Sequence, residues 1–173
     1  MSPEQIYKLA CQYRKKLKTN NPFDLLDAIG AVVKFSGAYP AGGLRGYCTV
    51  LLKTKYCVIS QNQPEEEQLV VAAHEAGHLI LHQERLKAGA LQDWDVYHAE
   101  GVMEREANLF AADFLIDDVD VLEQVQTKNS DFFSLAKALS VPAPFLAFKL
   151  YSMVHRGHRL LMPSEPQNRF LKK

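Results

Sequence analysis

The chain has 173 residues, of which 47% are hydrophobic and 23% charged, and its 20 Lys and Arg residues equal its 20 Asp and Glu residues in number. This is the composition of one globular domain, and zero net charge gives the chain as a whole no basic excess for binding phosphate backbones. The three cysteines follow no CxxC spacing, no apolar stretch approaches about 18 residues, and the N-terminal MSPEQIYKLA lacks the apolar run of a signal peptide. We therefore expect a single cytoplasmic domain over residues 1–173, without a disulfide framework or a membrane segment.

Two helices are predicted at the N-terminus. Ser2-Pro3-Glu4 is a typical helix start, and the first helix has one apolar face, formed by Ile6, Leu9, Ala10, Tyr13 and Leu17. Asn21-Pro22 begins a second helix, and Gly30 ends it.

Strands are expected next. Residues 31–36 form a short strand, and residues 37–43 form a turn or mobile loop. Residues 44–52 and 56–60, rich in Val, Tyr and Cys, pair around Lys53-Thr54-Lys55, and either strand could serve as the edge that receives an extended peptide. The order of helices, small antiparallel sheet and further helices indicates an α+β fold.

The most informative segment is His74-Glu75-Ala76-Gly77-His78, an HExxH run in an apolar helix expected over residues 65–83. Side chains four residues apart share one helix face, so His74 and His78 can bind a single Zn²⁺. Glu75 is then placed to act as a base on water rather than as a ligand. The alternative is that both histidines are core residues satisfied by backbone carbonyls and that Glu75 is a surface carboxylate. His82 lies too far along the helix to bind the same ion and is expected to be structural, bonded to the loop that follows.

A third ligand is expected on a helix after residue 101, beyond a long connection over residues 86–101. The apolar stripe of that helix places Glu104 toward the core and Glu106 toward solvent. Two histidines and one glutamate form a catalytic zinc site with an open fourth position. In the alternative interpretation, Glu104 is a surface acid beside Arg105.

These two segments, AAHEAGHLILH and EREANLFAADFL, resemble those of the ImmA/IrrE family of zinc metallopeptidases, many of which are encoded by mobile elements beside repressor genes. The matched positions are Ala73, His74, Glu75, Gly77, His78 and His82, followed by Glu104, Ala107, Asn108, Phe110, Ala111 and Leu115.

The resemblance implies a zincin-like metallopeptidase core with an active-site helix and a C-terminal helical segment. Its metal ligands would be His74, His78 and Glu104, its catalytic base Glu75, and its cofactor Zn²⁺. Asn108 would hold a histidine, although Asn is the neutral variant at that position. Such an enzyme would cleave a protein substrate at limited sites, plausibly a helix-turn-helix repressor.

The chain departs from the family at Ile116-Asp117, where Met-Pro is common, so the exit of the glutamate helix is left open. A short helix is then expected around Val119 to Val125. A donor to the developing oxyanion is also expected, and Tyr97 and His98 are the candidates, with no ground for choosing between them.

Within the single domain, residues 1–126 are predicted to be the catalytic core and residues 127–162 a helical segment that imitates a helix-turn-helix. A DNA-reading helix begins with basic and polar residues, whereas this one begins with Pro142-Ala143-Pro144-Phe145. We therefore favour a packing or substrate-docking role and do not expect nucleic-acid binding. The competing classes are a non-catalytic zinc-fold module that interacts with a repressor, and a DNA-binding regulator with a vestigial peptidase core. The sequence does not define an oligomeric state.

Overall fold

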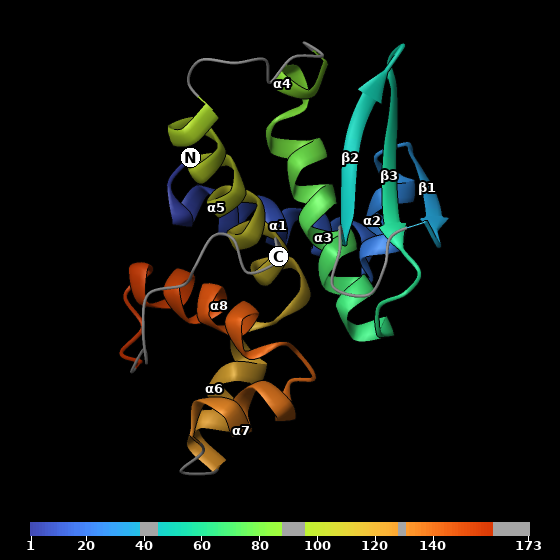
Figure 1. Cartoon of the computed structure of the whole chain (residues 1–173). Coiled ribbons are helices and arrows are strands. Elements are labelled where there is room, and N and C mark those ends of the chain that lie inside the picture. Colours follow the sequence, from blue (N-terminus) through green and yellow to red (C-terminus); the bar gives the residue numbers. More distant parts are fainter. Residues whose placement is uncertain (39–44, 88–95, 128–130, 161–173) are drawn as a thin grey trace.

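Helix α3 (Glu65–Leu81) lies at the centre of the molecule, with a small sheet on one side and the other long helices on the other (Figure 1). This computed structural model describes residues 1–38, 45–87, 96–127 and 131–160, except for the side chains of 87, 96–100 and 127. The remaining helices are α1 (Pro3–Leu17), α2 (Pro22–Ala28), α4 (Gln83–Lys87), α5 (Val96–Leu115), α6 (Asp118–Thr127), α7 (Phe132–Ala138) and α8 (Ala143–His155). The strands are β1 (Ala31–Ser36), β2 (Gly46–Leu51) and β3 (Thr54–Ser60).

The α+β class is confirmed, but the sheet is mixed rather than antiparallel. Its order is β1-β3-β2, with β2 antiparallel to β3 and β1 parallel to β3 (Figure 1). Leu52 and Lys53, both at positive φ, form the tight turn between β2 and β3. After β1 the chain crosses to the far edge before β2 begins, so β1 and β3 run in the same direction. The predicted loop at 37–43 lies mostly outside the described residues.

The two N-terminal helices begin and end as the sequence predicts. Ser2 and Gln5 form a reciprocal capping box at the start of α1. Asn21 caps α2 by accepting a hydrogen bond from the backbone N–H of Phe23. Gly30 follows α2 at a φ of +71°, a conformation that favours glycine, and it turns the chain into β1.

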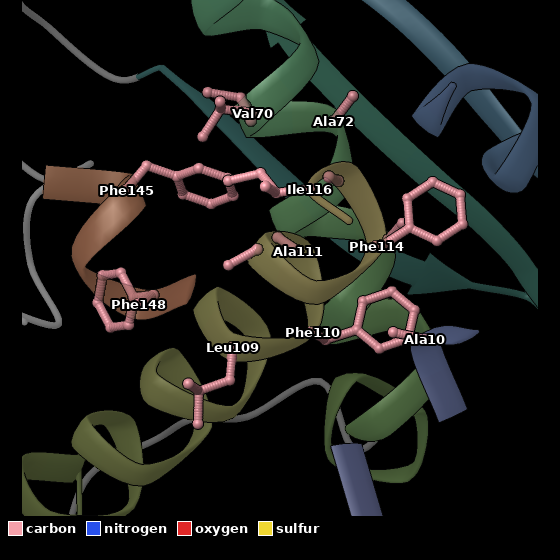
Figure 2. Packing of buried hydrophobic residues seen from close by; sticks show 14 of the residues in the cluster. Ala10, Val70, Ala72, Leu109, Phe110, Ala111, Phe114, Ile116, Phe145 and Phe148 are labelled. Atoms are coloured by element: carbon pink, nitrogen blue, oxygen red, sulfur yellow. The ribbon is translucent and has the colours of Figure 1, made fainter. Parts of the chain in front are cut away.

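The hydrophobic core surrounds the second half of α5 (Figure 2). Phe110 and Phe114 of α5 stack with ring centroids 6.2 Å apart, and Ala10 of α1 lies beside them. Phe145 and Phe148 extend the same core onto α8. Because α5 contacts α1, α3 and α8, it fixes the position of each relative to the others.

A second buried group of residues is polar and joins α5 and α6 to α8. Lys149, fully buried, lies 2.9 Å from Asp113 Oδ1 and 2.6 Å from Asp118 Oδ1. Arg156 donates two hydrogen bonds to Asp118 at 2.6 and 2.8 Å, and Ser152 donates one to Asp113 at 2.6 Å. We call these five residues the buried ion cluster.

Three boundaries differ from those predicted. The active-site helix ends at Leu81 rather than 83, and a short helix, α4, occupies Gln83–Lys87. Helix α5 begins at Val96, so part of the predicted long connection over 86–101 is helical, and residues 88–95 lie outside the described part. Beyond Ile116-Asp117 the chain begins α6 at once, near the predicted short helix.

In the described part of the chain, no single helix is long and apolar enough to cross a membrane. Helices α7 and α8 reach the required length and composition only when taken together, across a bend of 100°.

Candidate metal centre

Helix α3 carries the HExxH residues on a segment that is buried on all sides. His74, Glu75 and His78 are 4%, 7% and 8% exposed. The sheet covers one side of α3 and α5 covers the other, because apolar residues flank the motif in both directions along the helix. Buried histidines and carboxylates require polar partners, and the neighbouring elements supply them.

His74, His78 and Glu104 converge on one point between α3 and α5. The two Nε2 atoms lie 3.1 Å apart, and Glu104 lies 3.5 Å from His74 Nε2 and 3.4 Å from His78 Nε2. In a tetrahedral site with bonds of about 2.0–2.1 Å, neighbouring ligand atoms are about 3.3 Å apart. The three side chains therefore fit a zinc-sized cation, and together they form a group that could hold a metal ion.

The electrostatics of this group favour positive charge at its centre. Burial alone would lower the pKa of His74, but Glu104, Glu75 and Asn108 outweigh it and raise that pKa. Burial alone would raise the pKa of Glu104, but the two imidazoles outweigh it and lower that pKa strongly. A divalent cation held by these side chains would supply that positive charge.

Asn108 holds the first histidine. It is fully buried on α5, one turn after Glu104, and its Oδ1 lies 2.8 Å from His74 Nδ1. An amide oxygen can only accept a hydrogen bond, so His74 Nδ1 carries the proton and Nε2 keeps its lone pair for a cation. Asn108 occupies the position expected from the family pattern, where its neutral amide is sufficient to fix the tautomer.

Two predictions about neighbouring side chains are wrong. Glu106 does not face solvent: its side chain is 14% exposed, and it accepts hydrogen bonds from His82 Nε2 at 2.9 Å and from the amino group of Met1. His82 bonds to Glu106 on α5 and to His78, 3.1 Å away, rather than to the loop that follows it. The helical phase of α5 predicts which residues face its own apolar side, but it does not show that His82 at the end of α3 covers Glu106.

Glu75 points to the sheet side of the same site. Cys48 of β2 lies close to it: burial raises the pKa of Cys48, and the charge of Glu75 raises it further, so Cys48 stays a thiol. Gly46 is also close: a Cβ there would lie 3.8 Å from Glu75 Oε1 and 2.5 Å from Val71 Cγ1. The sequence predicts Cys48 only as a small core residue, and no local signal connects it with Glu75.

Gly77, at the fourth position of HExxH, sets the spacing of α3 and α5. A Cβ at Gly77 would lie 3.1 Å from the carbonyl oxygen of Ala107 and 3.3 Å from the Phe110 ring. A side chain at this position would require α5 to move by a few tenths of an ångström. The close approach brings Glu104 within reach of the histidines.

The oxyanion candidates are placed only in part. Tyr97 and His98 lie in the first turn of α5 rather than in a loop, and their side chains lie outside the described residues.

The α+β fold and the His-Glu-His-Glu constellation are those of an HExxH metallopeptidase-type domain. The chain matches the peptidase M78 family, described as the IrrE N-terminal-like domain, over residues 31–151, and it belongs to that family. No curated protein matches the sequence significantly.

Among solved structures, the chain is similar to a Mycobacterium tuberculosis transcriptional regulator, with a TM-score of 0.60 and 13% sequence identity. The alignment covers 95% of this chain and 49% of the regulator, so the chain spans about half the length of that protein. At this identity the likeness concerns the fold.

Proposed function

We propose that the protein is a zinc-dependent endopeptidase that cleaves a protein substrate at limited sites. The observation that carries this proposal is the position of Glu75: a buried carboxylate directly after His74 on α3, whose charge acts on His74, in a site where His74, His78 and Glu104 could hold one metal ion. A binding module that only used zinc for folding would have no need of this second carboxylate. Membership of the peptidase M78 family supports the same conclusion.

The residues of the site have different roles in peptide hydrolysis. His74, His78 and Glu104 would hold Zn²⁺, which supplies a Lewis acid for the scissile carbonyl and lowers the pKa of water toward about 7. Glu75 takes a proton from the attacking water and later delivers it to the leaving amine. Cys48, which stays a thiol, lies on the sheet side of Glu75 and adds no charge that would compete with this role.

The substrate would bind along β2. Of the two predicted strands, β3 is central and pairs on both sides, so it cannot receive a peptide, whereas β2 lies at the edge of the sheet. The contact of Gly46 and Cys48 with α3 places this edge beside Glu75. An extended peptide paired with β2 would pass the ligand group with its backbone aligned along the strand.

We further propose that the substrate is a repressor with a helix-turn-helix domain, encoded beside this protein and present in the same compartment, the cytoplasm. Support comes from the resemblance to peptidases that adjoin repressor genes. A non-catalytic partner of such a repressor is the competing proposal, and a cleavage assay separates the two.

The test compares wild type with Glu75→Gln at matched zinc content. Glu75→Gln is expected to keep the metal and the fold but to lose at least about 100-fold in hydrolysis of the neighbouring repressor, because it lacks the acid–base group. Glu84→Gln, a change on α4, is the control and should cleave like wild type. Full activity in zinc-loaded Glu75→Gln would overturn the mechanism. Firm binding of the repressor by wild type without any cleavage would favour the non-catalytic partner.

A further inference from the structure

We propose that His82 and Glu106 form a positioning pair that holds the candidate metal ligand His78 in the tautomer and orientation required for zinc. The proposal rests on the proposed zinc site and deepens it. The role of the pair follows from two contacts outside the ligand group: His78 Nδ1 lies 3.1 Å from His82 Nδ1, and His82 Nε2 lies 2.9 Å from Glu106 Oε2.

The positions of the protons in this series of contacts can be assigned by starting from His78. If His78 Nε2 supplies a lone pair to a cation, its proton must be on Nδ1, which then donates to His82 Nδ1. His82 Nδ1 is therefore the acceptor, and the proton of His82 is on Nε2, where it donates to the Glu106 carboxylate. Each nitrogen in the chain then has one defined role.

The opposite proton assignment does not fit these contacts. A proton on His82 Nδ1 would face the N–H of His78 Nδ1 across 3.1 Å, and His82 Nε2 would face the Glu106 carboxylate with a lone pair. Both contacts would be repulsive. Glu106, whose side chain is only 14% exposed, therefore selects the His82 tautomer, and His82 selects that of His78.

With this pair, each of the two candidate histidine ligands is held, directly or through His82, by a side chain of α5. His74 is held by Asn108, which is on α5 and fully buried. His78 is one turn further along α3; its Nδ1 contacts His82, which is 7% exposed, and His82 in turn connects it to Glu106 of α5. Both ligand imidazoles are thereby fixed to α5, the helix that also carries Glu104. A carboxylate behind an imidazole also increases the basicity of the ligand that it supports.

The experiment measures zinc affinity by chelator competition in wild type, His82→Leu and His82→Gln. Leu preserves volume but cannot accept a hydrogen bond, and partners of this kind contribute about 10- to 100-fold in metal affinity, so His82→Leu should bind zinc more weakly by that factor. Gln offers an amide oxygen to His78 Nδ1 and should restore most of the affinity. The control is His155→Leu on α8, where the histidine is exposed and bonded to the Tyr151 carbonyl; its affinity should equal that of wild type.

Wild-type affinity in His82→Leu, or equal losses in His82→Leu and His82→Gln, would overturn the proposal. If His82→Leu does not fold, Glu106→Leu takes its place, with Glu106→Gln as the variant that should restore affinity. Imidazole ¹⁵N spectra of zinc-loaded wild type provide an independent measurement: protons on His78 Nδ1 and His82 Nε2 are expected, and a proton on His82 Nδ1 would contradict the assignment. These readouts do not use hydrolysis, so a wild type that binds zinc but cleaves nothing would refute the endopeptidase and leave the pair standing. A wild type without zinc would refute both.

Discussion

Helix α5 carries two buried polar clusters that differ in where their positive charge comes from. In its middle, Glu104 and Asn108 face the histidines of α3. About 14 Å further along the axis, Asp113 faces Lys149 of α8, within the buried ion cluster. The ion cluster contains two acidic and two basic side chains and is compensated by the chain itself. The metal centre pairs its carboxylates with imidazoles, whose charge depends on protons or on a metal. The C-terminal part of α5 therefore has a structural role, and its middle carries residues that could hold an exchangeable cation.

The largest effect is expected from Lys149→Met, which leaves Asp113 buried without its main partner. Breaking a buried pair on one side costs about 3–5 kcal/mol of stability. If the two clusters are independent, denaturant unfolding should show the same loss with and without zinc. The double variant Lys149→Met/Asp113→Leu should recover part of it, because no unpaired charge remains at that pair. A loss that zinc reverses would show that the clusters are coupled through α5.

Zinc should stabilise the metal centre by an amount that depends on its concentration. At a free zinc concentration 100-fold above Kd, binding to the native state adds about 2.7 kcal/mol to the free energy of unfolding. His74→Ala should abolish this gain, while its own stability stays constant as zinc is titrated. Thermal unfolding across a zinc series would measure both. A zinc-independent melting temperature in wild type would contradict the exchangeable cation.

Asn108→Leu should weaken zinc binding by about 10-fold or more, because His74 loses the acceptor that fixes its tautomer. Asn108→Asp keeps an acceptor at the same distance and should retain zinc. Chelator competition on the three proteins would decide the matter. Equal affinities would mean that the imidazole is oriented by packing alone.

The smallest effect is expected on the stability of the fold at acidic pH. Burial alone would raise the pKa of Asp118, but Arg156 and Lys149 outweigh it and lower the pKa below its usual range. A carboxyl whose pKa is lower in the folded than in the unfolded state stabilises the fold above the unfolded pKa of about 3.9. That contribution is lost as the pH falls below this value toward the folded pKa. Stability measured from about pH 7 down to pH 3 should therefore decline less steeply in Asp118→Asn than in wild type. Parallel curves would show that Asp118 contributes nothing to the acid response.

The parts of the site that the sequence predicts well are those fixed by local geometry. The i, i+4 spacing of His74 and His78 and the inward phase of Glu104 depend only on helical periodicity, and the structure brings all three together. Asn108, one turn after Glu104, is expected only from the family resemblance, and the structure places it at His74. The caps of α1 and α2 are equally local and appear as expected.

The parts that the sequence does not predict depend on how distant elements cross. The contact of His82 with Glu106 requires the end of α3 to lie over α5, and helical phase alone assigned Glu106 to solvent. The contact of Cys48 with Glu75 depends on the register of β2 against β3 and on the depth at which α3 packs on the sheet. The direction of β1 depends on the path of the chain between β1 and β2, where local periodicity carries no information.

Gly77 contributes no side chain to the candidate metal centre, yet we expect it to influence which ions fit there. The separation of ligand atoms grows with the metal–ligand bond, from about 2.0–2.1 Å for zinc with nitrogen to about 2.3–2.6 Å for calcium, which also demands six to eight oxygen ligands. With the Ala107 carbonyl only 3.1 Å from where a Cβ would lie, the helices are about as close as backbone atoms allow. The distance between α3 and α5 thus depends on the absence of a methyl group at Gly77, and we expect this distance, together with the chemistry of the ligands, to favour small cations.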